Sequence, residues 1–295
     1  MQTDGNFPTS VEICLIPYWT DVAAAAISYY YFVLPLRSIL TVPNMTSASS
    51  IPLAELAPLP KADGSASFSH CGYAVTAAVN GPIEAPRRDE NPFEALIDVV
   101  VRPAAGVGGT AERQLEAIVQ AALRQLIPVR DFPRCMIQVT LQVMETPKNA
   151  YHNEKLVQAQ LNLTIIPALL HAAVLGLLTA AVPLKAIAVS TTLAISADNR
   201  EIVVEPSTET ASKAKSVHAL AFTSSDELLL SESSGSFSIE EWDRILETGQ
   251  RICCQDQESG IDAEISETSN LGSASIKAFI RSVLEKKSAA DLHWK

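Results

Sequence analysis

Residues 74–178 limit most strongly what this chain can fold into, because strand-like and helix-like patterns alternate there with few interruptions. Residues 74–79 and 96–102 are short apolar runs next to turn-forming residues, a pattern typical of strands. In residues 135–144 apolar and polar side chains alternate, which predicts a strand with one buried face. We therefore expect three strands within this stretch.

Two helices are expected in the same stretch. From Glu112 onward apolar residues recur at helical spacing, which predicts a helix with one buried face that ends at Pro128. Residues 156–178 are apolar on nearly every side, which predicts a helix buried in a large core. This run is long enough to cross a membrane, but polar and proline residues inside it argue against that; they are Gln158, Gln160, Asn162, Pro167 and His171. We expect His171 to be a hydrogen-bonded core residue rather than a ligand.

Two hairpins are expected after this helix. Residues 186–195 and 201–204 are strand-like and separated by a turn, and residues 217–222 and 227–231 repeat the pattern. Paired strands that lie next to each other in the sequence favour an antiparallel arrangement.

Two further helices are expected near the C-terminus. Ser238 and Glu241 have the spacing of a capping box, which marks the start of a helix. Residues 276–284 carry an apolar stripe at helical spacing. Between them, the acidic residues 255–270 are expected to form a solvated loop.

Composition and charge narrow the class of protein. Hydrophobic residues make up 47% of the 295 residues, so the chain can bury a large core and is not disordered overall. The formal net charge of −11 excludes binding of nucleic acid over the whole surface, because phosphate binding requires clustered lysine and arginine. A local basic patch remains compatible with this charge.

Cysteine usage indicates the redox environment. Five cysteines occur without a C-x-x-C pair, which favours reduced thiols and a cytosolic or nuclear compartment. His70 and Cys71 are adjacent and resemble half of a metal-ligand set, but the sequence places no second pair near them. We therefore expect both residues to be structural, with no metal ion and no cofactor.

The first 62 residues differ from the rest and are expected to be a disordered N-terminal extension, followed by a single domain over residues 63–295. Residues 46–60 have the composition of a linker and residues 63–67 that of a turn. The apolar run 22–36 can be read as a membrane anchor or signal, or as part of an unstructured extension. We favour the second interpretation, because the run is shorter than the ~20 residues of a spanning helix and has no basic flank.

Two loops have features that can bind anions. Gly106, Gly108 and Gly109 precede the first expected helix, and the backbone N–H groups of such a loop can bind phosphate. Without a Walker lysine or a G-x-G-x-x-G pattern after the strand, this signal for nucleotide binding is weak. Arg87 and Arg88 lie in a proline-rich loop, where they either contact anions or are simply solvated.

Four short motifs follow one another in a characteristic order: N-G-P-I-E at 80–84, V-R-P-A at 101–104, F-P-R at 132–134 and I-V-V-E-P at 202–206. Together with the order of strands and helices, they make residues 63–250 similar to the RNase PH family. More narrowly, they resemble one type of RNase-PH-like ring subunit of the eukaryotic RNA exosome. The resemblance implies an α+β, RNase PH-like fold (ribosomal protein S5 domain 2-like), in which mixed sheets pack against helices.

The resemblance also implies partners. RNase-PH-like exosome subunits assemble into a six-membered ring, and RNA threads through its central channel. S1/KH cap subunits and an associated hydrolytic exoribonuclease belong to the same complex, which works in the nucleus, the nucleolus and the cytoplasm. We accordingly expect RNA but no DNA and no membrane as a partner, and Arg87 and Arg88 are the candidate RNA contacts.

The residues that carry the family's chemistry are mostly missing. Active members cleave RNA by phosphorolysis with an arginine ahead of the first helix, a Gly-Thr-Arg loop after the alternating strand and a later carboxylate. Here Arg113 is the nearest arginine, residues 146–148 read Thr-Pro-Lys, and Glu205 or Glu209 would have to replace the carboxylate. We expect a non-catalytic structural subunit that supports 3′–5′ RNA processing and degradation, including rRNA maturation. The alternative is an active phosphate-dependent 3′–5′ exoribonuclease built from Lys148, Arg113 and Glu209.

Overall fold

The structure is a computed structural model, and it describes residues 51–147, 162–197, 201–254 and 276–292. These residues lie in one compact unit, 46–295, while a second unit, 1–45, lies wholly outside the described residues. The apolar run 22–36 and the acidic residues 255–270 therefore stay predictions. None of the helices in the described ranges has the length and hydrophobicity needed to cross a bilayer.

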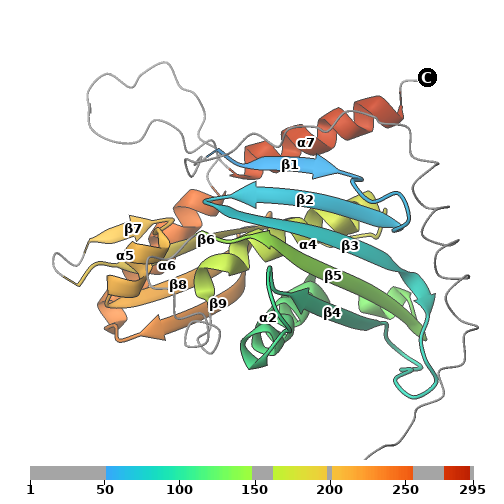
Figure 1. Ribbon diagram of the computed structural model, residues 1–295, viewed down its shortest axis with the longest axis horizontal. Helices are drawn as coiled ribbons and strands as arrows, with labels where there is room; N and C mark the ends of the chain where they lie inside the picture. Colours follow the sequence, from blue (N-terminus) through green and yellow to red (C-terminus); the bar gives the residue numbers. More distant parts are fainter. Residues whose placement is uncertain (1–50, 148–161, 198–200, 255–275, 293–295) are drawn as a thin grey trace, which may run out of the picture. The chain divides into compact units, whose positions relative to one another are not determined.

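The first sheet has five strands in the order β1-β2-β3-β5-β4 (Figure 1). They are β1 (Leu53–Leu56), β2 (Gly64–His70), β3 (Tyr73–Glu84), β5 (Cys135–Glu145) and β4 (Leu96–Arg102). Strands β4 and β5 pair in parallel and all other pairs are antiparallel. The sheet is therefore mixed, as the resemblance implied, and the three strands expected from residues 74–79, 96–102 and 135–144 are confirmed.

The start of this sheet corrects the sequence prediction. Residues 46–60 were expected to be a linker, but β1 lies within them and pairs with β2. Residues 63–67 were expected to be a turn, but β2 begins at Gly64. Gly64 instead allows this strand to pack closely against the segment around Ala180, because a Cβ atom at Gly64 would lie only 2.3 Å from the backbone nitrogen of Ala180.

The second sheet has four antiparallel strands in the order β7-β6-β8-β9. They are β7 (Ile202–Val204), β6 (Ala188–Ile195), β8 (Ser216–Thr223) and β9 (Leu228–Gly235), so both expected hairpins are confirmed. Every residue of β6 is buried, because helices cover both faces of the sheet at this strand.

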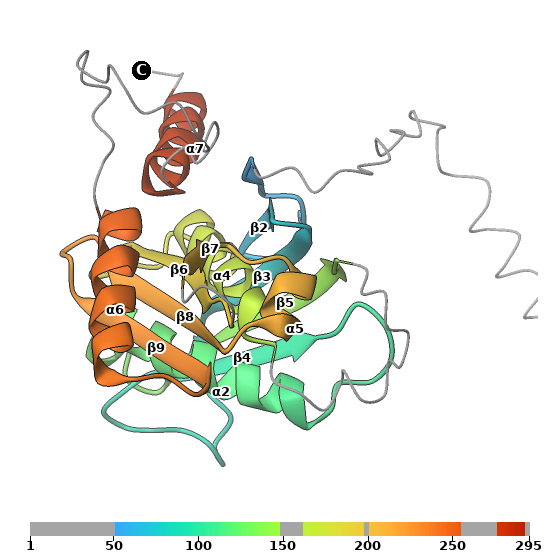
Figure 2. The ribbon, with the colours of Figure 1, turned by 90° about the vertical axis from the view of Figure 1, so that its left-hand side faces the viewer.

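Helices fill the space between the sheets and cover the second sheet (Figure 2). Helix α4 (Ile166–Thr179) lies between the sheets and contacts β2 and β3 on one side and β6 on the other, with α2 (Thr110–Leu126) beside it. Helix α6 (Ile239–Cys254) packs on the opposite face of the second sheet and contacts the C-terminal α7 (Ile276–Asp291). The capping box before α6 is confirmed: Ser238 N–H donates to Glu241 Oε2, and Glu241 N–H to Ser238 Oγ.

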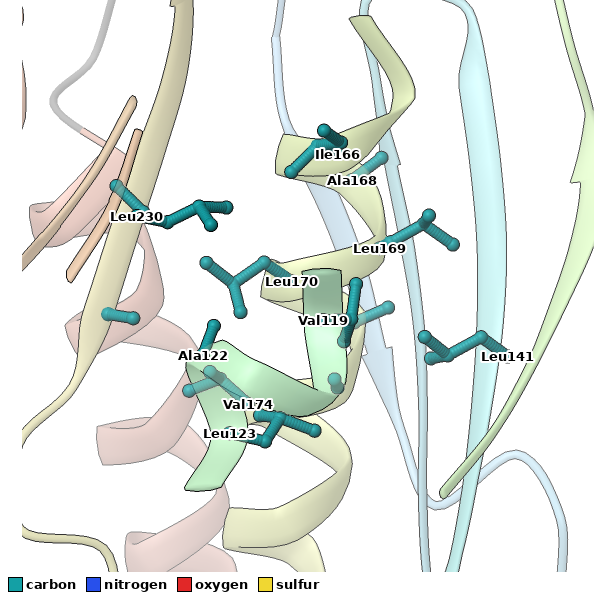
Figure 3. Packing of buried hydrophobic residues seen from close by; sticks show 14 of the residues in the cluster. Val119, Ala122, Leu123, Leu141, Ile166, Ala168, Leu169, Leu170, Val174 and Leu230 are labelled. Atoms are coloured by element: carbon teal, nitrogen blue, oxygen red, sulfur yellow. The ribbon is translucent and has the colours of Figure 1, made fainter. Parts of the chain in front are cut away.

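The position of α4 explains why its sequence is apolar on every side. Figure 3 shows Leu169 directed toward Leu141 of the first sheet, while Leu170 is directed toward Leu230 of the second. The expected start of this helix is wrong over residues 162–165, since a short 3₁₀ turn, η2 (Leu163–Ile165), precedes α4. Asn162 caps that turn by accepting the N–H of Thr164. Residues 156–161 lie outside the described part of the chain.

His171 of α4 is a buried core residue, as expected, and it completes the edge of β6. Strand β7 pairs with β6 at residues 193–195, and Glu205 N–H donates to the Thr192 carbonyl oxygen; upstream of Thr192, β7 does not reach the edge of β6. There the N–H of Ser190 donates to His171 Nε2 at 3.0 Å. This bond requires neutral imidazole with its proton on Nδ1, an atom that has no partner among the described residues.

The close approach of β2 to α4 gives a first testable prediction. Gly64→Ala is expected to lower the free energy of unfolding by about 1–3 kcal/mol, because the new methyl group would overlap α4 backbone. Gly108→Ala is the matched control, since its Cβ would meet nothing closer than 3.8 Å. Urea denaturation measures both; equal stability of the two variants would contradict the packing described for Gly64.

The buried histidine gives a pH-dependent prediction. Burial lowers the pKa of His171 from 6.5 to about 3, so between these values the unfolded chain binds a proton that the folded chain excludes. Stability should therefore fall as the pH decreases from about 6.5 toward 3, by at most about 1.4 kcal/mol per pH unit for this group.

His171→Gln keeps a side-chain acceptor for Ser190 N–H but cannot titrate. The slope of unfolding free energy against pH, measured by urea denaturation between pH 7 and 5, is expected to be smaller in this variant. An unchanged slope would show that His171 contributes no proton linkage.

Candidate functional site

The glycine-rich loop before α2 has the form of a phosphate site, but the protein fills it with its own carboxylate. Helix α2 begins at Thr110 with Gly109 as its N-cap, and a helix N-terminus attracts anions. Glu112 Oε2 accepts the N–H of Gly109 at 2.6 Å. A phosphate ion would have to displace this carboxylate and overcome its charge.

The second family loop, after β5, lies against the β2–β3 turn. Of residues 146–148, the described part of the chain includes Thr146 and Pro147 but not Lys148. Pro147 is adjacent to Gly72, where an added Cβ would lie 3.3 Å from Pro147 Cγ. Since proline has no backbone N–H, this position offers one anion donor fewer than another residue would.

The β2–β3 turn brings His70 and Cys71 to Glu205, which follows β7 in the second sheet. The Cys71 thiol donates to Glu205 Oε2 at 3.3 Å, and His70 Nε2 lies 3.6 Å from the same oxygen. The sequence places no second ligand pair near His70 and Cys71, but the fold brings one further ligand-type residue, Glu205, next to them. Glu205 is 134 residues from Cys71 in the sequence, and it lies next to Cys71 in the fold because the two sheets meet here.

These three residues line a small pocket together with hydroxyl-bearing side chains. Tyr73, Thr164, Thr191 and Thr192 contribute the hydroxyl groups, and the Tyr73 hydroxyl is hydrogen-bonded to Thr164 and Asn162. The cavity volume is about 30 Å³, which is room for an ion or a water molecule but not for a nucleotide. Its lining, among the described residues, contains no lysine and no arginine.

Burial makes the thiol and the phenol of this pocket unreactive as nucleophiles. Burial, reinforced by the Glu205 carboxylate, raises the pKa of Cys71. Burial also raises the pKa of Tyr73. Both groups are therefore protonated at neutral pH, and a protonated thiol is a poor nucleophile.

The two candidate carboxylates are separated by the fold. Glu205 lines the pocket, whereas Glu209 is exposed on the short helix α5 (Thr208–Lys213) and is not part of the lining. Arg113 is also exposed and is absent from the lining. Among the described residues, the parts of the alternative enzyme therefore do not converge on this pocket.

Arg87 and Arg88 lie elsewhere, in the loop between β3 and β4. Both are exposed, and neither forms an ion pair with a carboxylate in the described ranges. The other arginines near this loop are paired: Arg124 and Arg130 with Glu94, and Arg134 with Glu90. Arg87 and Arg88 thus remain available to an external anion.

Comparisons with known proteins agree with this geometry. Residues 53–183 match the model of the RNase PH, or 3′ exoribonuclease, family, domain 1. The chain is 32% identical over 206 residues to the Saccharomyces cerevisiae protein named exosome complex component RRP46, covering 68% of this chain and 89% of that protein. The chain belongs to the RNase PH family.

Further relatives carry the same name. The Schizosaccharomyces pombe exosome complex component rrp46 is 29% identical over 194 residues, covering 64% of this chain and 79% of that protein. An Oryza sativa protein named exosome complex exonuclease RRP46 homolog is 28% identical over 168 residues, covering 57% of this chain and 64% of that protein. RRP46 is also the subunit type that the four sequence motifs resemble.

Solved structures confirm the RNase PH-like fold. The crystal structure of rice Rrp46 superposes with a TM-score of 0.62 at 25% identity, covering 79% of this chain and 94% of that one. An Archaeoglobus fulgidus exosome with RNA bound to its active site gives a TM-score of 0.54 at 18% identity, covering 68% of this chain and 84% of that one. The latter likeness concerns the fold alone.

The structure also reveals site residues that the sequence did not indicate. Thr191 and Thr192 read as ordinary residues of a buried strand, and Tyr73 as the start of another. Their convergence on His70, Cys71 and Glu205 depends on the pairing of β6 with β7 and on the turn after β2. No local pattern encodes that arrangement.

The self-capped helix gives a testable prediction. Glu112→Ala is expected to lower the free energy of unfolding by about 1 kcal/mol, because α2 loses the carboxylate at its positive end. The variant should also become more stable on adding phosphate, whereas the wild type should respond less. Thermal denaturation with and without phosphate measures both effects, with the exposed neighbour Arg113→Ala as the control. Equal phosphate responses in wild type and Glu112→Ala would contradict occupancy of the loop by Glu112.

Proposed function

We propose that this chain is a non-catalytic structural subunit of the core ring of an RNA exosome. In this role it supports 3′–5′ RNA processing and degradation, including rRNA maturation, by forming part of the channel through which RNA threads. The proposal is supported by relatives named exosome complex component RRP46 and by the fold shared with solved exosome cores.

The lack of positive charge around the candidate pocket carries the non-catalytic part of the proposal. Phosphorolysis brings a phosphate anion to a phosphodiester anion, so a site must offset their repulsion with fixed cations and aligned N–H donors. The pocket has no lysine or arginine in its described lining, and Glu112 already holds the N–H of Gly109. Glu205 lines the pocket, and a carboxylate without a neighbouring cation adds to the negative charge there instead of offsetting it.

The partners follow from the same role. Other RNase-PH-like subunits complete a six-membered ring with this chain, S1/KH cap subunits bind the ring, and an associated hydrolytic exoribonuclease cleaves the RNA. The complex works in the nucleus and nucleolus and also in the cytoplasm. Arg87 and Arg88 contact RNA phosphates, a role supported by their exposure and by the lack of ion pairs in the described part of the chain.

Charge reversal tests the RNA contact. Arg87→Glu combined with Arg88→Glu, placed in assembled rings, should weaken retention of long RNA. It should also lower the slope of log affinity against log salt by about 1.4 or more, since each contact to a single strand contributes about 0.7.

A control with the same change in net charge combines Arg244→Glu and Arg251→Glu, two exposed positions on α6. It should leave RNA protection unchanged in rings of normal composition. If the first double variant protects long RNA as well as wild type does, the assignment of Arg87 and Arg88 is wrong.

An active phosphorolytic exoribonuclease is the second candidate, because the rice relative is named an exonuclease. Purified chain incubated with end-labelled RNA and phosphate is expected to release no nucleoside diphosphates. Diphosphate release that Lys148→Ala abolishes would overturn the non-catalytic assignment and point to Lys148, Arg113 and Glu209 as its parts.

A further inference from the structure

We propose that His70, Cys71 and Glu205 bind one divalent transition-metal ion of the zinc class, which links the β2–β3 turn of the first sheet to the segment after β7 of the second. This inference goes beyond the proposed role in RNA processing and does not depend on it. Nothing in that role requires a metal ion in this chain.

The distances between the three side chains match a four-coordinate zinc site. Cys71 Sγ lies 3.3 Å from Glu205 Oε2, His70 Nε2 lies 3.6 Å from that oxygen, and Cys71 Sγ lies 3.7 Å from His70 Nε2. Bonds of about 2.0–2.3 Å at tetrahedral angles place neighbouring ligands roughly 3.3–3.6 Å apart. Cys71 Sγ also lies 3.5 Å from His70 Nδ1, so the imidazole ring must rotate to direct Nε2 between Sγ and Oε2 before an ion can bind all three atoms.

The donor set indicates which metals fit. One nitrogen, one sulfur and one carboxylate oxygen form a mixed set that suits zinc or cobalt, whereas magnesium and calcium take oxygen ligands. Three protein ligands leave one position of a tetrahedral site for water. The ligand atoms of all three residues lie within 4.8 Å of one another, so rotation of side chains, without movement of the backbone, brings them to one ion.

A separate observation also points to a ligand in this pocket. Thr191 Oγ1 is buried and has no hydrogen-bond partner in the described part of the chain, although its residue is only 1% exposed and lines the same cavity. A buried hydroxyl without a partner is costly. Water completing the coordination of the ion would provide that partner, and the cavity of about 30 Å³ has room for it.

A backbone hydrogen bond anchors one of the three ligands, and two of them have left-handed backbone angles. Cys71 and Glu205 have φ angles of 50° and 51°, left-handed values that are unfavourable for residues other than glycine. Glu205 is fixed further because its N–H donates to the Thr192 carbonyl oxygen at 2.8 Å. Rigid ligands lose little conformational entropy on binding, which favours affinity.

The electrostatics of the cluster favour a cation as well. The Glu205 side chain is 21% exposed and the His70 side chain 10%, so solvent screens their charges only partly. A divalent ion would neutralise Glu205 and displace the proton of the Cys71 thiol, because metal-bound thiols are deprotonated. Binding should therefore release about one proton per ion.

Cobalt and zinc titrations of the metal-free full-length chain test the proposal. Cobalt should bind with one ion per chain, giving the sulfur-to-cobalt charge-transfer band in the near ultraviolet and the intense visible bands of a four-coordinate site. Zinc should displace it, raise the melting temperature and release a proton. Magnesium should do none of these.

Variants of two ligands sharpen the test. Cys71→Ser should abolish the charge-transfer band and weaken zinc binding about 100-fold or more, since even the loss of an outer-shell partner costs 10–100-fold. Glu205→Gln should keep the band but weaken zinc binding. Cys135→Ser and Glu209→Gln remove another thiol and another carboxylate, and both should bind like wild type.

Three results would overturn the metal site. The first is a charge-transfer band that survives Cys71→Ser. The second is an equal zinc affinity of Glu205→Gln and wild type. The third is that a chain shown to be folded by circular dichroism binds neither cobalt nor zinc. None of them bears on RNA retention or diphosphate release, so the exosome role stands or falls separately.

Discussion

Burial of α4 between two sheets is the constraint on which the rest of this fold depends. Eleven residues of this helix are buried, and it contacts strands of both sheets. The helix approaches the first sheet closely where small residues lie at the contact, namely Gly64 of β2 and its own Gly176. Fixing α4 also fixes His171 against the edge of β6. The edges of the two sheets then meet near the start of α4, and the candidate pocket lies there.

The chain has the scaffold of the RNase PH family, and carboxylates lie near both loops that the resemblance to this family marks for phosphate. The strands and helices that pack the core follow the RNase PH pattern closely enough to match a family model over residues 53–183. The loop before α2 instead presents Glu112, and the pocket beside the other loop contains Glu205 and no cation in its described lining. The core depends on apolar periodicity, whereas binding of an anion depends on a few charged groups, so the two can change independently.

The sequence predicted those parts of the fold that depend on local patterns. The alternation in β5, the stripe of α2 and the capping box of α6 each follow from neighbouring residues, and each is confirmed. The predictions failed where long-range packing outweighs local preference: residues 63–67 look like a turn, but Gly64 and its neighbours form a strand because α4 packs closely on them. The cluster of His70, Cys71 and Glu205 could not be predicted, since it joins two sheets over 134 residues. The four motifs, by contrast, sufficed to identify the family.

The bond between Glu112 and Gly109 also changes how an anion competes for the α2 N-terminus. The carboxylate is tethered three residues away from the donor, so its effective concentration at that N–H is of millimolar order or higher whatever the solution contains. A dissolved phosphate fills an unoccupied loop once its concentration exceeds its dissociation constant. With the carboxylate in place, the concentration required rises by roughly the ratio of the effective concentration to the carboxylate's own dissociation constant. Glu112, in the first turn of α2, thus competes with any external anion for the N-terminus of the same helix.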